Sequence, residues 1–147
     1  MHKLSAVQTV EKLNAKTLSL KQVLTSLNER IDQLDPKLNA FLYRCEPESI
    51  VNKENTCLAG LPISFKDQYH IEGLPCSFGI PKAKVSPSTA DLVKLLRDKG
   101  ANILGKTSLP PLAMDFQTSN KMRGFCNNPW NTLYTCGGSS GGGAAAV

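Results

Sequence analysis

Two adjacent hydroxyl groups, those of Ser139 and Ser140, lie in a glycine-rich run and could take part in nucleophilic chemistry. Residues 136–147 read Cys-Gly-Gly-Ser-Ser-Gly-Gly-Gly-Ala-Ala-Ala-Val. A Gly/Ser stretch is also the usual composition of a flexible linker, so this alternative stays open. The run leads, however, directly into small apolar residues that favour a helix. A tight turn that carries hydroxyls into a helix is typical of a buried site where backbone approaches a ligand.

The composition limits which groups could activate such a hydroxyl. The 2 histidines, His2 and His70, are too few and too far apart to indicate a metal site or a Ser-His-Asp triad. The 5 cysteines are unevenly spaced and include no Cys-x-x-Cys pair, which predicts reduced thiols in a cytoplasmic protein. A hydrolase with this sequence would therefore need a base other than histidine.

Length and charge indicate a globular protein. The 147 residues are 41% hydrophobic and 20% charged, and they can bury one core. The net charge of +5 comes from scattered lysines and arginines with few aromatics between them, so we expect no nucleic-acid partner. No apolar stretch approaches the length of a membrane span, and the N-terminus lacks the apolar region of a signal peptide, so no membrane partner is expected.

The elements that must position the serines alternate between helices and strands. Apolar spacing predicts a helix over residues 5–15 and a second one that begins after Ser19 and ends before Pro36. Alternating apolar residues predict a strand over 61–67, which places Ser64 and Lys66 on the face opposite Phe65. The remaining predicted elements are a strand over 37–44, a loop or weak helix over 45–60, a loop over 73–87, a helix over 91–99, a strand over 101–105, a turn or short helix that starts at 110–111, and a loop over 120–135. This interleaving predicts an α/β fold without internal repeats.

Several separated stretches match one family in the order in which they occur. They are residues 60–67 (Gly-Leu-Pro-Ile-Ser-Phe-Lys-Asp), 105–110 (Gly-Lys-Thr-Ser-Leu-Pro), 127–130 (Asn-Asn-Pro-Trp) and 137–142 (Gly-Gly-Ser-Ser-Gly-Gly). Together they resemble the amidase signature family of C–N hydrolases, over essentially the whole chain. The resemblance implies an α/β fold with a mixed sheet surrounded by helices. Residues 1–147 would then be the N-terminal part of a single, incomplete amidase domain that stops soon after the Gly-Gly-Ser-Ser-Gly-Gly motif.

The resemblance also implies a Ser-Ser-Lys triad. Lys66 would be the base, because a lysine that is kept neutral by burial can accept a proton from a hydroxyl. Ser139 would be the bridging serine, preceded by a cis peptide bond, and Ser140 would support the loop or cap the following helix. The nucleophilic serine of the family lies farther along than Val147, so we expect the isolated chain to be inactive.

Other residues are assigned supporting roles by the same resemblance. Gly137 and Gly138 would shape the serine loop. For Asn128 and Trp130 we expect a structural role that does not depend on the resemblance, in which they hold a neighbouring loop in place rather than contact substrate. Asp115, Gln117 and Ser119 are candidates for substrate contact. A small amide is the expected substrate, and no metal or organic cofactor is expected because lysine and serine supply the whole proton relay.

Three functions stay open at this point. The first is a free-standing amidase. The second is a glutaminase-type component of a tRNA-dependent amidotransferase, which would work in a complex with other subunits. The third is a degenerate, non-catalytic fragment that acts only by pairing with another chain. The missing C-terminal segment or a homo-oligomer is the expected protein partner.

Overall fold

The computed structural model describes residues 4–45 and 56–147 of the chain. Its helices are α1 (Ala6–Asn14), α2 (Leu20–Leu38), α3 (Asp91–Asp98) and α4 (Gly141–Ala146), with a short 3₁₀ helix at Pro111–Ala113. Its strands are β1 (Phe41–Arg44), β2 (Pro62–Lys66), β3 (Pro75–Cys76), β4 (Lys84–Val85), β5 (Asn102–Thr107), β6 (Ser119–Asn120), β7 (Gly124–Phe125), β8 (Asn127–Asn128) and β9 (Asn131–Thr135).

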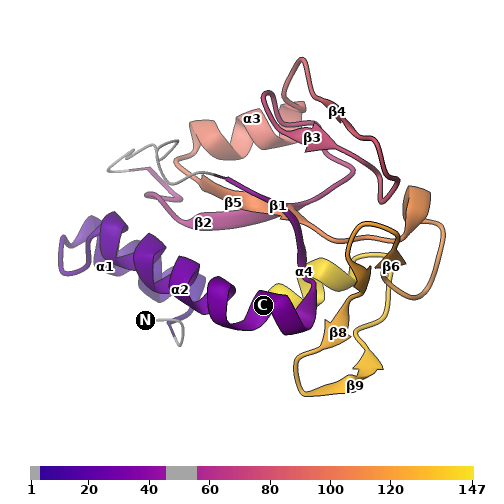
Figure 1. The fold of residues 1–147 in the computed structure, drawn as a ribbon. Coiled ribbons are helices and arrows are strands. Elements are labelled where there is room, and N and C mark those ends of the chain that lie inside the picture. Colours follow the sequence, from indigo (N-terminus) through magenta and orange to yellow (C-terminus); the bar gives the residue numbers. More distant parts are fainter. Residues whose placement is uncertain (1–3, 46–55) are drawn as a thin grey trace.

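A three-stranded mixed sheet forms the centre of the fold. The strand order is β1-β5-β2, with β1 antiparallel and β2 parallel to β5. Helix α3 lies on one side of this sheet, while α2 and α4 lie on the other (Figure 1). The remaining strands form two-stranded ladders at the periphery. The predicted mixed α/β architecture is therefore confirmed.

Two apolar clusters hold the helices against the sheet. On the α3 side, Phe65 packs with Ile71 and Val93, and each is at most 5% exposed. On the other side, Leu38 and Phe41 pack with Ala145 of α4 and with Cys126. Because side chains alternate along a strand, a residue next to Phe65 in β2 must face α4 rather than α3.

Both N-terminal helices begin at capped serines. The side chain of Ser19 accepts a hydrogen bond from the backbone N–H of Gln22, and the Gln22 side chain accepts one from the backbone N–H of Ser19. Ser5 and Gln8 form the same capping box at the start of α1. The predicted start of α2 is confirmed.

The predicted end of α2 was wrong, because the helix continues through Pro36 to Leu38. Proline lacks an N–H group, so its place in the last turn removes one hydrogen bond from the helix. Two tertiary interactions offset this loss. Asp35 accepts backbone hydrogen bonds from Ala40 (2.7 Å) and Phe41 (3.1 Å), and Leu38 is buried in the core.

Other boundaries also differ from the sequence prediction. The strand predicted over 37–44 begins only at Phe41, because α2 occupies the residues before Asn39. The loop predicted over 73–87 contains the β3–β4 ladder, and the loop predicted over 120–135 contains the β8–β9 ladder and, apart from Ser119, the β6–β7 ladder. Strand β9 is exposed at every residue, so it shows no apolar alternation that could have predicted it. Of the segment 45–60, residues 46–55 lie outside the described part of the chain.

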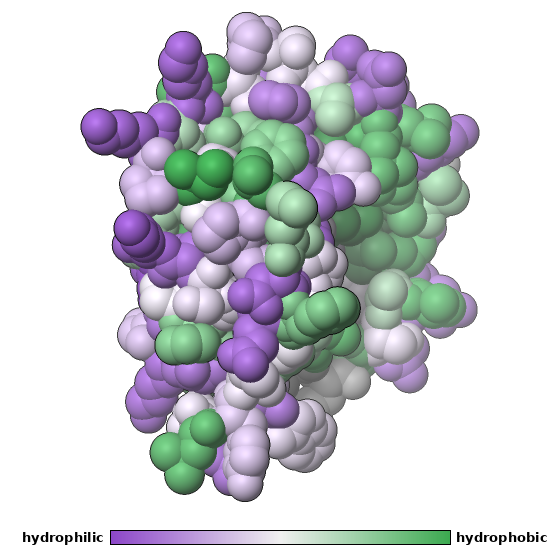
Figure 2. Space-filling model, turned by 90° about the vertical axis from the view of Figure 1, so that its right-hand side faces the viewer, coloured by the Kyte–Doolittle hydropathy of each residue, from purple (hydrophilic) through white to green (hydrophobic). Residues whose placement is uncertain are grey.

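The surface carries several large apolar side chains. Phe116, Trp130 and Leu133 are 92%, 95% and 89% exposed. On the face drawn in Figure 2, green apolar patches alternate with purple polar ones. No helix within the described residues is both long and apolar enough to cross a membrane.

Candidate active site

Lys66 is the last residue of β2 and lies opposite Thr107 in the parallel ladder with β5. Its neighbour Phe65 points into the cluster beneath α3. The Lys66 side chain therefore extends from the other face of the sheet, where α4 begins. The predicted alternation of 61–67 thus places a half-buried amine at the N-terminal end of α4.

The lysine amine contacts both serines of the glycine-rich run. Lys66 Nζ donates hydrogen bonds to Ser139 Oγ at 2.7 Å and to Ser140 Oγ at 2.9 Å. The peptide bond between Gly138 and Ser139 is cis, as the resemblance implies. Residues that are 73 positions apart in the sequence thus form one polar cluster. The run is an ordered turn rather than a linker.

Ser140 occupies the N-cap position of α4, yet its side chain forms no capping hydrogen bond. Its hydroxyl accepts a hydrogen bond from Lys66 instead, while its backbone carbonyl accepts one from Ala144 at 3.1 Å. Of the two interpretations offered for Ser140, the geometry favours support of the lysine and the loop over capping.

The surroundings of Lys66 favour its neutral form. Burial lowers the pKa of the Lys66 amine from the ordinary value of 10.5. Asp67, which follows it in the sequence, is fully buried and forms an ion pair with Lys106 at 2.5 Å. Asp67 also accepts a hydrogen bond from the backbone N–H of Ser77 at 2.9 Å. Among residues 4–45 and 56–147, no carboxylate forms an ion pair with Lys66, so no such contact opposes its deprotonation.

Backbone hydrogen bonds to the end of β5 hold both halves of the site in place: the segment that carries Lys66 and the loop that carries the serines. The N–H of Asp67 donates to the carbonyl of Thr107, and the N–H of Gly142 donates to the carbonyl of Ser108, each at 3.1 Å. A Cβ atom at Gly142 would lie 2.3 Å from the backbone nitrogen of Ser108 and 2.5 Å from the carbonyl oxygen of Ala40. Only glycine allows α4 to approach the strand this closely.

Thr118 holds the serine loop from the other side. Its Oγ1 accepts a hydrogen bond from the N–H of Gly141 at 2.9 Å, and its own N–H donates to the carbonyl of Gly137 at 3.0 Å. The residue is fully buried. Sequence reasoning missed Thr118, since a single threonine between polar residues carries no pattern. It also missed Lys106, although the matched stretch 105–110 contained it.

The two predicted loop glycines have different roles. Gly137 has a φ of +80°, a conformation that favours glycine, although a Cβ atom at this position would meet nothing within 4 Å. At Gly138, a Cβ atom would lie 2.9 Å from the carbonyl oxygen of Asp115. The serine loop therefore packs directly on the backbone of residues 115–117.

The predicted substrate-contact segment lies beside the serine loop. Its side chains, which belong to the described part of the chain, form no hydrogen bond with the Lys66 amine. The carboxylate of Asp115 accepts a hydrogen bond from the backbone N–H of Gln117 at 3.0 Å, and both side chains are exposed. Ser119 is half-buried in β6. No hydrogen bond within the described residues joins these three side chains to Lys66. Their contact with substrate stays a prediction.

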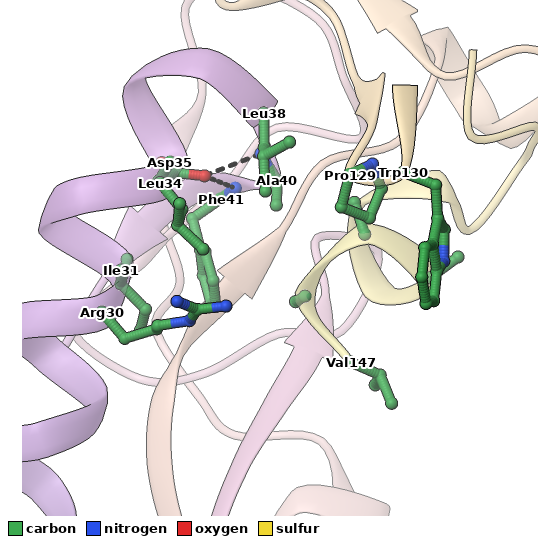
Figure 3. A pocket seen from close by; sticks show the side chains of 13 residues that line it. Arg30, Ile31, Leu34, Asp35, Leu38, Ala40, Phe41, Pro129, Trp130 and Val147 are labelled. Atoms are coloured by element: carbon green, nitrogen blue, oxygen red, sulfur yellow. Dashed lines mark hydrogen bonds between the residues drawn. The ribbon is translucent and has the colours of Figure 1, made fainter. Parts of the chain in front are cut away.

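A pocket of about 420 Å³ lies between α2 and α4, apart from the lysine and the serines. Figure 3 shows Leu34 and Phe41 on one side of it, with Trp130 and Val147 on the other. Neither Lys66 nor the serine pair lines this pocket. The expectation that Trp130 holds its loop in place was wrong, because Trp130 is 95% exposed. Asn128 does hold this loop, since its side-chain oxygen accepts a hydrogen bond from the backbone N–H of Trp130 at 2.9 Å.

The lysine–serine cluster brings together an amine and two hydroxyls, groups that can exchange protons with one another. Across the part of the chain that the structure describes, no three His, Cys, Asp or Glu residues are grouped so that they could hold a metal ion. A family model described as Amidase matches residues 22–147. This chain belongs to the amidase family.

Curated relatives of this amidase family member are about one-third identical to it over the residues that align. It is 33% identical to a glutamyl-tRNA(Gln) amidotransferase subunit of Thermoanaerobacter pseudethanolicus and 35% identical to the corresponding subunit of Pseudomonas aeruginosa. In both comparisons the whole chain is covered, but only 33% of the relative. The chain thus spans about a third of the length of the curated relatives that it matches.

Solved structures with the same fold include other amidase signature proteins. The chain superimposes with a TM-score of 0.87 on a bacterial aryl acylamidase of the amidase signature family, at 27% identity, covering 98% of this chain and 33% of that one. A protein from a vestigial complex related to the origins of an s-triazine catabolic enzyme gives a TM-score of 0.92 at 28% identity, covering 98% of this chain and 35% of that one. These neighbours confirm the amidase-signature fold.

Proposed function

We propose that the polypeptide carrying this chain hydrolyses the C–N bond of a carboxamide through a Ser-Ser-Lys relay. The observation that carries this proposal is the hydrogen bond of 2.7 Å between Lys66 Nζ and Ser139 Oγ, at an amine whose pKa burial lowers. The matched amidase family supports amide hydrolysis as the class of reaction.

The relay moves one proton in each direction. The nucleophilic serine attacks the amide carbonyl as its proton passes to Ser139 Oγ, whose own proton passes to the neutral amine of Lys66. The protonated lysine then returns the proton through Ser139 to the leaving nitrogen, and the C–N bond breaks. Water releases the acyl group from the serine by the same relay. Ser140 holds the Lys66 amine in line through its hydrogen bond of 2.9 Å.

Residues 1–147 supply two of the three groups in this scheme. By the family pattern, the nucleophile lies at a position beyond Val147. We therefore propose that a polypeptide restricted to residues 1–147 binds no acyl group and is inactive. In a serine hydrolase whose triad acts as a unit, loss of the nucleophile costs about 10⁶ in turnover.

The test measures amine or ammonia release from simple aliphatic and aryl amides by the polypeptide that carries this chain. Lys66→Ala should lower kcat/KM by about 10²–10⁴, the usual contribution of a general base. Lys94→Ala is the matched control, because Lys94 pairs with Asp91 on an exposed face of α3. Unchanged activity in Lys66→Ala would refute the relay.

A second candidate is the glutaminase component of a tRNA-dependent amidotransferase. The names of the curated relatives, at 33–35% identity, favour it. Glutamine is itself a carboxamide, so the same relay would serve both functions. Ammonia release from glutamine that depends on added partner subunits supports this candidate. Turnover of many amides by the protein alone supports the free-standing amidase, and turnover of none supports the non-catalytic alternative.

A further inference from the structure

Two cysteines face each other at the open end of the β8–β9 ladder. Cys126 directly precedes β8 and Cys136 directly follows β9, and the pairing of Asn127 with Thr135 places the two cysteines opposite one another. The N–H of Cys136 donates to the carbonyl of Cys126 at 3.4 Å, and the Cys136 thiol donates to the same oxygen at 3.1 Å.

This geometry suits a disulfide. Directly opposed residues of an antiparallel ladder have Cα atoms about 4.5–5.5 Å apart. Disulfides span Cα separations of about 4.4–6.8 Å. Side chains of opposed residues also point to the same face of the ladder. Rotation of the two side chains could therefore bring the sulfurs together without rearrangement of the strands.

We propose that Cys126 and Cys136 are a modification site: a thiol pair that closes to a disulfide when a peroxide oxidises it. Cys136 directly precedes the Gly137–Gly138 turn that carries Ser139. Cys57 and Cys45, in contrast, lie elsewhere in the sequence and outside this ladder.

The difference in burial between the two cysteines predicts which of them the peroxide oxidises first. Cys126 is fully buried, and desolvation together with the neighbouring Cys136 thiol raises the pKa of the Cys126 thiol. Cys136 is only half-buried, so it reacts first. The Cys136 thiol first loses its proton to solvent, and its thiolate attacks one oxygen of hydrogen peroxide. The O–O bond breaks, Cys136 becomes a sulfenic acid, and the hydroxide that leaves takes up a proton from solvent to form water. The Cys126 sulfur then attacks the Cys136 sulfur, the S–O bond breaks, and a second water leaves.

The disulfide would change the packing beside the catalytic turn. The Cys136 thiol now fills the space over Gly141, where a Cβ atom would lie 2.7 Å from its sulfur. Formation of the S–S bond would move the Cys136 sulfur toward Cys126 and so alter this contact. Resting on the proposed function, we infer that oxidation lowers amide turnover and that a thiol reductant restores it.

The experiment maps disulfides in the purified protein after treatment with hydrogen peroxide and alkylation of the remaining thiols. Chymotrypsin cleaves after Phe125, Trp130 and Tyr134, which separates the two cysteines onto different peptides. We expect a linked pair of these peptides, about 2 Da lighter than their sum because two hydrogens are lost. The link should be absent in Cys136→Ser and present in Cys57→Ser, the control at an exposed thiol.

Two results would overturn the proposal. One is a link from Cys126 or Cys136 to a different cysteine. The other is that both thiols stay free for alkylation at a peroxide dose that oxidises Cys57. Because mapping requires no turnover, its result is independent of the proposed amide hydrolysis.

Discussion

Lys106 Nζ lies 2.5 Å from Oδ1 of Asp67, and both side chains are completely buried. The amine also donates a hydrogen bond to the carbonyl of Pro75 at 2.7 Å. Asp67 is the residue after the candidate base, Lys66, and its charge is balanced by a different lysine. Because Asp67 is paired with Lys106, the carboxylate nearest to Lys66 in the sequence does not counteract the effect of burial, which lowers the pKa of the Lys66 amine.

Breaking this pair should destabilise the protein strongly. Lys106→Met leaves Asp67 buried without its counter-ion, which costs about 3–5 kcal/mol of unfolding free energy. Urea unfolding followed by circular dichroism measures this. The control is Asp91→Asn, which removes an ion pair whose carboxylate is 97% exposed and should leave the midpoint nearly unchanged. Equal midpoints for both variants would contradict the assignment.

The activity should depend on pH through Lys66. Burial lowers the pKa of this amine, so the neutral form that accepts a proton predominates at lower pH than for a lysine in water. We expect kcat/KM to rise with pH along a limb whose midpoint lies below 10.5, because that is the ordinary lysine value. A midpoint at or above 10.5 would argue against Lys66 as the base.

The lowered pKa of Lys66 also predicts how the free energy of unfolding changes with pH. The folded state binds fewer protons at Lys66 than the unfolded state does, so unfolding free energy rises with pH between the lowered pKa and 10.5. Lys66→Met removes the titrating amine and should flatten this rise. Urea midpoints at several pH values, compared with Lys94→Met on an exposed helix face, measure the difference.

Neighbouring glycines of α4 should respond oppositely to alanine. Gly142→Ala forces a Cβ atom to within 2.3 Å of the Ser108 nitrogen, and overpacking of this kind costs about 1–3 kcal/mol or more. Gly143→Ala meets nothing within 4 Å, and alanine favours the helix by up to about 1 kcal/mol. Thermal unfolding of the two variants gives the comparison. Destabilisation by both changes to a similar extent would mean that α4 does not approach β5 as described.

Thr118 should act through its hydroxyl. Thr118→Val keeps the shape but leaves the N–H of Gly141 without its acceptor, at a cost of about 1–3 kcal/mol. Thr118→Ser retains the oxygen and should stay close to the parent in stability and turnover. If valine were tolerated as well as serine in both measurements, the hydrogen bond would not position the loop.

The sequence predicted the elements whose pattern is local. Ser19 marks a helix start because its capping partner is three residues away, and 61–67 alternates because one face of β2 meets α3. The resemblance predicted Lys66 and Ser139, and the structure brings these two together. Their assignment as catalytic residues remains a prediction.

Other features depend on contacts that are distant in the sequence. The continuation of α2 through Pro36 depends on Asp35, whose carboxylate binds residues after the helix and the side chain of Arg123. The side chain of Thr118 has a structural role only because Gly141, 23 residues later in the sequence, donates a hydrogen bond to it. Partners of this kind leave no periodic signal, so propensity and spacing could not have found them.

Consecutive carbonyls at the end of β5, those of Thr107 and Ser108, receive the backbone of the lysine segment and of the serine segment. The distance between the lysine segment and the serine segment is therefore set by one peptide unit of the backbone. Side chains along β5 can be exchanged without changing its length. A one-residue insertion between these positions would displace one half by about 3.3 Å, more than the 2.7 Å that separates the amine from the hydroxyl. The spacing between Lys66 and the serine loop is thus encoded as a count of residues rather than as a choice of side chains.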